Sequence, residues 1–289
     1  MSENRDETLA LHSRFFRKYW GETPFPLALE RAWECRILSL QRFVRPVLDV
    51  GCGEGLFAKM LFANPIDTGI DPDPRELTRA QRFGAYKELI CCSGDTIPKP
   101  DASYRTIFSN SVLEHIPDVS SVLRELYRLL APGGQLFLTV PSHRYDQYTV
   151  VSQVLTACGL SGLAARYRRF FNRFWRHYHY YEPRGWEDLV RSAGFEVTEC
   201  YTYGPKGFCV LNDSVVPLCL PGMILKRLFN RWTLFPAGRR IALGPLKSLM
   251  ENLVRKGARA DDGGLVFLAL RKPSHGQDQA DDARFAKAG

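Results

Sequence analysis

The chain has 289 residues, 45% of them hydrophobic, and eight cysteines with no Cys-x-x-Cys pair. This length allows one α/β domain of ordinary size with additions and a full core. The scattered cysteines and the charged, polar residues 1–7 favour a reduced, cytoplasmic protein with no structural metal and no signal peptide. The whole net charge of +8 arises in residues 206–259, which hold ten cations and two acidic residues, and the remainder of the chain is neutral. This localised excess indicates either an anionic partner or a solvated basic surface.

Residues 1–45 are expected to form an N-terminal helical cap, with Pro24 and Pro26 dividing two helical stretches. Short apolar runs then alternate with helical patterns. Strands are expected at 46–50, 67–70, 88–92, 105–109 and 135–140, and helices at 54–63, 74–83 and 119–130. This alternation predicts a parallel, doubly wound sheet, in which ligands bind at the carboxyl ends of the strands.

Two insertions interrupt the pattern after residue 141. The first, residues 144–182, is rich in aromatic residues and arginine. A helix at 185–193 and a strand at 196–203 then resume the alternation, and a second insertion, 204–262, precedes the last strand at 265–271. Residues 46–272 are therefore expected to form one domain, followed by a disordered polar tail, 273–289.

Residues 47–55 read Val-Leu-Asp-Val-Gly-Cys-Gly-Glu-Gly, a buried strand that ends in a loop with alternating glycines. Such a loop lets backbone N–H groups approach a ligand, with a helix N-terminus behind them. A dinucleotide fingerprint would need a glycine where Leu56 stands. This departure disfavours a nicotinamide dehydrogenase.

Polar residues follow the next three predicted strands. Asp71 ends the second strand, where a carboxylate can accept two hydrogen bonds from a ribose. A Ser-Gly-Asp-Thr segment follows the third strand and contains Asp95, which can accept from an adenine amine. Residues 108–117 follow the fourth, and Pro-Gly-Gly at 132–134 stops a helix before the fifth.

Taken together, residues 46–141 resemble the class I S-adenosylmethionine (SAM) dependent methyltransferases, in particular the small-molecule group called type 11. The resemblance implies a Rossmann-like, doubly wound seven-stranded sheet whose last strand is antiparallel. Helical insertions after strand five and between strands six and seven would shape the acceptor site. It implies SAM as cofactor and the following cofactor-binding residues: Asp49, Gly51, Cys52, Gly53 and Gly55 at the glycine loop, Asp71 at the ribose, Pro72, Asp95 and Thr96 at the adenine, and Asn110 at the methionine moiety. Tyr19, Trp20 or Arg31 would close the site from the N-terminal side.

The segment Ser109-Asn110-Ser111-Val112 differs from the Asn/Asp-Pro-Pro-Tyr/Phe sequence of enzymes that methylate bases in DNA or RNA. We therefore expect no nucleic-acid partner. The absence of a His/Cys metal set also gives no support to a metal-dependent catechol-type reaction.

A hydroxyl acceptor gains from a general base, and histidine suits this role near pH 7. His143, directly after the fifth strand, is favoured as the base or as an orienting residue. His115 is the second candidate, for which a structural hydrogen bond is favoured over catalysis. His177 and His179 lie among tyrosines, and a lid or packing role suits them at least as well as catalysis.

The second insertion contains two basic amphipathic segments, 223–232 and 245–256. Such helices either lie in the interface of an anionic membrane or cover a core. The apolar run 215–225 is too short to span a bilayer. If the membrane interpretation holds, the protein is peripheral at the inner membrane face and its acceptor is a glycolipid or a lipid-linked saccharide.

The sequence therefore predicts a SAM-dependent methyltransferase. It would transfer the methyl group to an oxygen atom of a small-molecule or lipid-linked acceptor from glycan or envelope synthesis. Two alternatives stay open: a C- or N-methyltransferase of a natural product, and a SAM-binding protein without turnover. The acceptor and the oligomeric state are not specified by the sequence.

Overall fold

The computed structural model describes residues 5–229 and 260–274. Its centre is a seven-stranded sheet in the order β3-β2-β1-β4-β5-β7-β6. Strands β1 to β5 are parallel, and β7 is antiparallel to both of its neighbours. The predicted sheet with one antiparallel last strand is confirmed. The strands are β1 (Val47–Val50), β2 (Ile66–Asp71), β3 (Tyr86–Cys91), β4 (Tyr104–Asn110), β5 (Leu130–Pro141), β6 (Glu196–Tyr203) and β7 (Leu265–Arg271).

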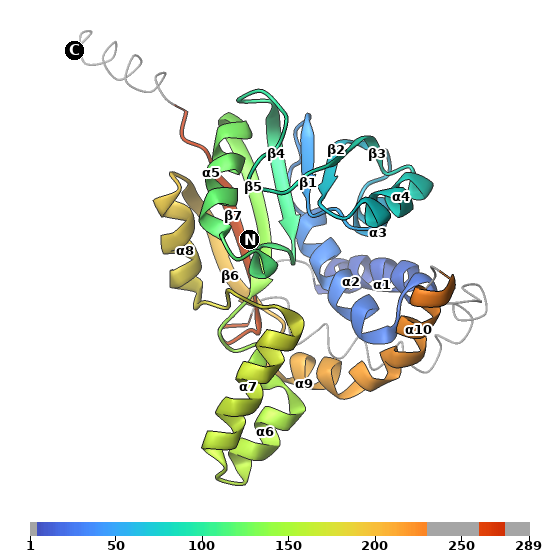
Figure 1. Cartoon of the computed structure of the whole chain (residues 1–289), viewed down its shortest axis with the longest axis vertical. Helices are drawn as coiled ribbons and strands as arrows, with labels where there is room; N and C mark the ends of the chain where they lie inside the picture. The colour runs from blue at the N-terminus through green and yellow to red at the C-terminus, as the bar shows by residue number, and fades with distance from the viewer. Residues whose placement is uncertain (1–4, 230–259, 275–289) are drawn as a thin grey trace.

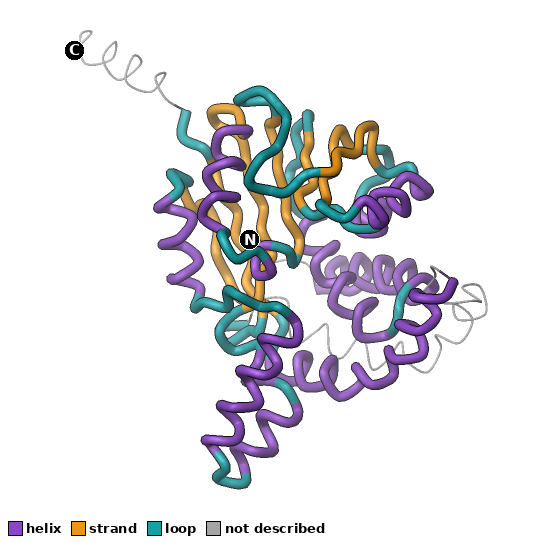
Figure 2. Tube along the Cα trace, in the orientation of Figure 1, coloured by secondary structure: helices purple, strands orange, loops and turns teal. Residues whose placement is uncertain are grey.

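Helices cover both faces of the sheet, as a doubly wound fold requires (Figures 1 and 2). Because successive strand residues point to opposite faces, β4 contributes to two separate cores. Phe108 packs with Trp33 from the N-terminal helices, and Ile107 packs with Trp186 on the other face. The helices outside the insertions are α1 (Arg5–Glu22), α2 (Phe25–Ser39), α3 (Leu56–Leu61), α4 (Pro74–Phe83), α5 (Val119–Leu129) and α8 (Pro183–Ser192).

Local signals set several helix ends. The side chain of Asp118 accepts a hydrogen bond from the Ser121 N–H at 3.1 Å and caps α5. Gly84 ends α4 in the left-handed conformation, with φ of 57°. Both ends agree with the sequence prediction.

The start of β5 differs from the prediction. The strand begins at Leu130 rather than at residue 135, so the Pro-Gly-Gly segment lies inside it. Tyr104 pairs with Leu130 and Thr106 with Gln135, and a register shift between these pairs absorbs the additional residues. The predicted helix stop is therefore an irregular, bulged strand entrance.

The two insertions are mostly helical. The first contains the short 3₁₀ helix η2 (Asp146–Tyr148), then α6 (Val150–Ala157) and α7 (Ser161–Trp175), which form a hairpin that projects away from the sheet (Figure 1). The described part of the second contains α9 (Lys206–Val215), η3 (Val216–Cys219) and α10 (Leu220–Phe229). The predicted helix at 245–256, the end of the one at 223–232 and the tail beyond 274 lie outside the described residues. Within the described ranges, every helix is too short or too polar to cross a bilayer.

Candidate active site

The glycine loop after β1 has one open face. Gly51, Gly53 and Gly55 all have positive φ. A Cβ on Gly51 would lie 2.5 Å from Cγ1 of Val112, and one on Gly55 would lie 3.0 Å from the Cβ of Ala80. A Cβ on Gly53 would meet no atom within 4 Å. Gly51 and Gly55 therefore permit close packing of the loop, whereas Gly53 borders space that a ligand can occupy.

Two carboxyl groups support this loop from the ends of β1 and β2. Asp49 is buried and accepts a hydrogen bond from the Tyr86 hydroxyl at 2.7 Å. Burial raises the pKa of Asp49 to about 7, against the opposing effect of the Tyr86 hydrogen bond. Asp71 accepts the Gly53 N–H on Oδ2 and the Asp73 N–H on Oδ1, each at 2.9 Å. Because burial disfavours the Asp49 carboxylate, a cationic group of a ligand bound next to it would stabilise that charge.

The remaining predicted cofactor residues lie along the same edge, because β1, β2 and β3 are adjacent and parallel. Cys52 is buried, and burial raises the pKa of its thiol, which stays protonated. Pro72, Asp95 and Thr96 are exposed, and the Ser93 hydroxyl donates to Asp95. The sheet edge thus offers one continuous strip from the glycine loop to the segment after β3.

Glu34 of α2 joins the N-terminal helices to the end of β4. Its side chain is fully buried and pairs with the Arg31 guanidinium at 2.5 Å. It also accepts hydrogen bonds from Asn110 Nδ2 at 2.8 Å and from Ser111 Oγ at 2.7 Å. The Asn110 Oδ1 accepts from Thr139 at 2.8 Å, so this amide holds α2 and β5 together. Its predicted contact with the methionine moiety stays a prediction.

The segment after β4 borders two spaces at once. Ser111 adopts a positive φ of 52°, which is unusual for a residue with a side chain. Its N–H donates to the Thr139 carbonyl oxygen at 3.0 Å. Val112 then packs on Gly51, and Ser111 and Glu114 line a separate cavity. One short loop therefore connects the glycine loop to that cavity.

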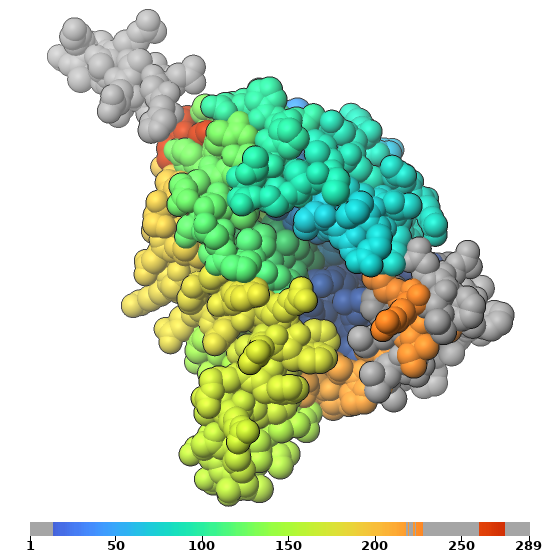
Figure 3. All heavy atoms as spheres, in the orientation of Figure 1, coloured from blue at the N-terminus to red at the C-terminus, as the bar shows by residue number. Residues whose placement is uncertain are grey.

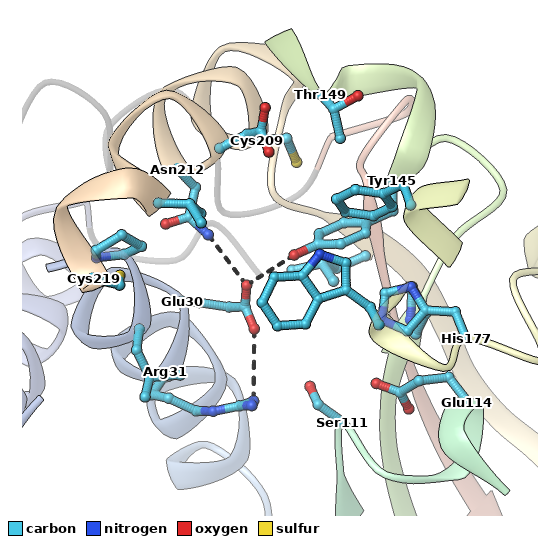
Figure 4. A pocket seen from close by; sticks show the side chains of 18 of the residues that line it. Glu30, Arg31, Ser111, Glu114, Tyr145, Thr149, His177, Cys209, Asn212 and Cys219 are labelled. Atoms are coloured by element: carbon cyan, nitrogen blue, oxygen red, sulfur yellow. Dashed lines mark hydrogen bonds and ion pairs between the residues drawn. The ribbon is translucent and has the colours of Figure 1, made fainter. Parts of the chain in front are cut away.

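The cavity has a volume of about 340 Å³ (Figure 4). Its walls come from α2, the loop after β4, the end of β5, the end of α7, and α9. Glu30 lies at the centre of its polar side, where its Oε2 accepts from the Tyr145 hydroxyl and from Asn212 Nδ2, both at 3.3 Å. Further lining residues are Arg31, Ser111, Glu114, His115, Phe171, Trp175 and His177.

Burial disfavours the charged forms of the glutamates and histidines that line the cavity. It raises the pKa of Glu30 to about 7 and that of Glu114 to about 8. Oε2 of Glu114 has no hydrogen-bond partner within the described part of the chain. Burial also lowers the pKa of His115, and lowers that of His177 to about 4. Both imidazoles are therefore neutral at pH 7.

His115 has the geometry of a proton acceptor. Its Nδ1 donates to the Arg176 carbonyl oxygen at 3.3 Å, so the lone pair of the neutral ring is on Nε2. Nε2 lies 3.7 Å from Oε1 of Glu114. The ring of His177 is 5.2 Å away, measured between centroids. The structural hydrogen bond that the sequence favoured for His115 exists, and it leaves the other nitrogen available.

His143 lies elsewhere. Its N–H donates to the Tyr181 carbonyl oxygen at 3.0 Å, and its Nε2 accepts from Arg144 Nε at 3.4 Å. It is not among the described residues that line the cavity. His179 bonds through Nε2 to the Ile116 carbonyl oxygen at 2.9 Å, a packing role. Of the histidines considered from sequence, the structure brings His115 and His177 together.

Three glutamates of the site were not predicted from the sequence. Glu30 and Glu34 lie four residues apart on α2, next to the buried Leu29 and Trp33. Acidic residues beside an apolar helix stripe are the signal that could have found them. Glu114 lies in the segment 108–117, whose pattern gives this residue no role of its own. Of the N-terminal candidates, Arg31 lines the cavity, whereas Tyr19 and Trp20 pack within the cap.

The described part of the second insertion contacts the core. Lys226 of α10 lies 3.4 Å from Glu54 and 3.9 Å from Glu76, so this cation meets acidic side chains at the starts of α3 and α4. The alternative in which these helices cover the core therefore fits α10. Across residues 5–229 and 260–274, no three His, Cys, Asp or Glu side chains are grouped to hold a metal ion.

Comparison with known proteins agrees with this geometry. Residues 28–200, more than half of the chain, match the family described as a methyltransferase domain. An uncharacterised methyltransferase of Mycobacterium tuberculosis is 38% identical over 122 residues, which are 40% of this chain and 60% of that relative. A ubiquinone biosynthesis O-methyltransferase of Pseudomonas syringae is 30% identical over 171 residues, covering 56% of this chain and 69% of that protein. The chain belongs to the methyltransferase family.

Solved structures show the same fold. A SAM-dependent methyltransferase from Thermotoga maritima superimposes with a TM-score of 0.55 at 16% identity, over 84% of this chain and 90% of that one. The cyclase SpnF superimposes with a TM-score of 0.52 at 19% identity, over 84% and 81%. Because a cyclase shares the fold, the fold alone does not specify the reaction.

The residues at the glycine loop fit SAM. The open face of Gly53 gives room for a ligand directly against the backbone. The SAM amino group would supply the cation that the buried Asp49 lacks, and Asp71 keeps lone pairs for the ribose hydroxyls. No metal is needed for this fit.

We predict that Gly53→Ala weakens SAM binding at least about tenfold, because the new methyl group fills the ligand space and strains a positive φ. Gly84→Ala is the matched control, since Gly84 also has a positive φ and open space around it but lies at the end of α4. Titration calorimetry with SAM measures both. Equal affinities of the two variants for SAM would show that Gly53 does not border the SAM site.

We predict that Glu34→Ala lowers the free energy of unfolding by about 3 kcal/mol. It removes the acceptor of Asn110 Nδ2 and Ser111 Oγ and leaves Arg31 with the more distant Glu30, at 3.7 Å. Asp188→Ala, at an exposed position on α8, should change it by less than about 0.5 kcal/mol. Denaturant titration provides the comparison. A cost as small as that of the control would show that Glu34 does not hold the cap on the sheet.

Proposed function

We propose that this protein transfers the methyl group of SAM to a hydroxyl oxygen of an acceptor bound in the cavity. The acceptor is a small molecule or the headgroup of a lipid-linked molecule. The observation that carries the proposal is the loop after β4. Its Val112 packs on the glycine loop, and its Glu114 and His115 line the cavity.

When bound, SAM supplies an electrophilic methyl group with a good leaving group, so the protein mainly positions the reactants and excludes water. Asp49, Gly53 and Asp71 would hold it at the sheet edge. The loop from Ser111 to His115 would then line both the donor site and the acceptor cavity. An in-line transfer needs the acceptor oxygen about 3 Å from the methyl carbon, so we expect the two ligands to meet directly beside this loop.

His115 is the base in this proposal. Its Nε2 accepts the proton of the acceptor hydroxyl, and the Arg176 carbonyl oxygen keeps the ring oriented through Nδ1. The imidazolium that forms is next to Glu114, whose Oε1 lies 3.7 Å from Nε2. His143, favoured from the sequence, is the alternative base, and its position outside the cavity argues against it.

The cavity suits a neutral, hydroxylated ring. About 340 Å³ is within the size range of small-molecule sites. Glu30, Tyr145 and Asn212 offer hydrogen bonds to hydroxyl groups, and Phe171 and Trp175 offer apolar walls. The similarity to a ubiquinone biosynthesis O-methyltransferase supports oxygen as the methylated atom.

An amine acceptor is the second candidate. Two buried carboxyl groups, Glu30 and Glu114, face a cavity with aromatic walls, and this combination also stabilises a cation. Mass spectrometry of the product after isotopic tracing separates N-, C- and O-methylation. Binding of SAM without any product would support the non-catalytic alternative.

A lipid-linked acceptor requires contact with a membrane surface. We therefore include in the proposal a cytoplasmic protein with peripheral contact to an anionic membrane. The sequence assigned this contact to the second insertion, but Lys226 of α10 pairs with the core. The hairpin of α6 and α7 is better suited to this contact.

We predict that His115→Asn slows methyl transfer about 100-fold, because it removes the proton acceptor, whereas His143→Asn stays within a fewfold of the wild type. The assay incubates methyl-labelled SAM with fractionated cell extract and measures the label in the lipid and aqueous phases. A loss confined to His143→Asn would assign the base to His143 instead.

We predict that the wild-type protein loses stability as pH rises towards 8. Burial raises the pKa of folded Glu114 from 4.5 to about 8, so between these values the folded state binds a proton that the unfolded state releases. Glu114→Gln removes this contribution. Its Tm should fall less than that of the wild type between these pH values, and parallel curves would contradict the raised pKa.

A further inference from the structure

The hairpin of α6 and α7 stands apart from the rest of the chain. It forms a lobe that projects from the body of the molecule (Figure 3). Its base is fixed by two polar contacts: Asn172 Nδ2 donates to Asp146 at 2.7 Å, and the Val150 N–H donates to Asp213 at 2.7 Å. The lobe is therefore anchored at one end and free at the other.

This lobe exposes apolar side chains of unusual size. On α7, Phe170 and Phe174 are each 63% exposed. Leu163 is seven residues before Phe170, so the three side chains form one stripe along the helix. Further exposed apolar residues lie on α6 and in the turn: Val151, Val154 and Leu160. Large apolar side chains gathered on one exposed helix face mark an interaction site in monomeric proteins.

The charge next to this stripe has a single sign. Residues 147–181 contain five arginines and no acidic residue. Arg166, Arg169 and Arg173 are exposed on α7, and helical geometry places them beside the apolar stripe, on one side of it. A surface that combines apolar side chains with exposed cations is complementary to an anionic bilayer.

A bilayer fits this surface better than a nucleic acid does. Single-stranded nucleic acids bind cations and stack their bases on aromatic rings, but Val151, Val154, Leu160 and Leu163 offer no ring. Aliphatic side chains gain free energy by leaving water for the acyl boundary. The mixture of aliphatic, aromatic and arginine side chains therefore favours the lipid interface.

The lobe also borders the cavity. Phe171 and Trp175 of α7 line the cavity, whereas the neighbouring Phe170 and Phe174 face outward, with Phe174 and Trp175 in edge contact at 5.1 Å. One helix thus presents one face to the acceptor space and the adjacent face to the surroundings. A headgroup at the bilayer surface would reach the cavity along this helix.

We propose that the α6–α7 hairpin docks the protein on the surface of an anionic bilayer. The docking itself is independent of the reaction; only the delivery of a lipid-linked acceptor to the cavity rests on the proposed function. The element is different from the basic segments of the second insertion. Because Phe171 and Trp175 of the same hairpin line the cavity, docking would bring the cavity wall that α7 forms towards the lipid.

Co-sedimentation of the full chain with vesicles tests this docking. We expect binding to vesicles of phosphatidylcholine mixed with phosphatidylglycerol, and much weaker binding to phosphatidylcholine alone. Phe174→Ser should weaken the binding at least about tenfold. Leu40→Ser, at an exposed apolar position on the cap (55% against 63% for Phe174), should leave it unchanged. Arg169→Gln with Arg173→Gln should weaken it, whereas the same charge removal at Arg14 and Arg17 on α1 should have little effect.

Three results would overturn the proposal. The first is equal binding of wild type and Phe174→Ser. The second is a loss of binding with Ile224→Ser of α10 instead. The third is binding of a single-stranded RNA oligonucleotide that depends on Arg169 and Arg173, with no binding to vesicles. Circular dichroism and SAM titration of every variant show that it is folded.

The two proposals fail separately. Vesicle binding needs no turnover, so methyl transfer without vesicle binding would end the docking proposal and leave the proposed function intact. Vesicle binding without any methyl transfer would leave the docking proposal intact and contradict the proposed function.

Discussion

The structure depends on one buried charge, the carboxylate of Glu34. A carboxylate without exposure to water is very costly unless it is paired and fully hydrogen-bonded. Arg31, Asn110 and Ser111 meet that need, and they come from α2 and from the end of β4. Because all three must be in place, α2 has one position on the sheet. That position forms a wall of the cavity and orients the loop that carries His115.

The site then divides into two halves with different physical character. The half at the glycine loop is built from backbone and from carboxyl groups at strand ends, and it suits a ligand that carries a cation and a ribose. The half in the cavity comes from α2 and the insertions, where burial keeps Glu30, Glu114 and the imidazoles near neutrality. A neutral or weakly basic acceptor suits that half. The loop after β4 belongs to both.

The sequence predicted the sheet and the glycine loop because their signals are local. Alternating apolar runs, glycine spacing and helix caps such as Asp118 depend on residues close in the chain. The cavity could not be predicted in this way, because it is made by contacts between distant segments, such as Glu30 with Tyr145 and Asn212. The positions of His115 and His143 relative to it follow from packing of the first insertion. The entrance of β5 was missed because a bulge let Pro-Gly-Gly enter a strand.

If the loop from Ser111 to His115 lines both the donor site and the acceptor cavity, the two spaces must meet beside it. A crystal structure with S-adenosylhomocysteine is the most direct test. We expect the thioether sulfur to lie beside this loop and to point into the cavity that contains His115 Nε2. A sulfur that points away from the cavity, or a ligand that does not contact the Gly53 face, would contradict it.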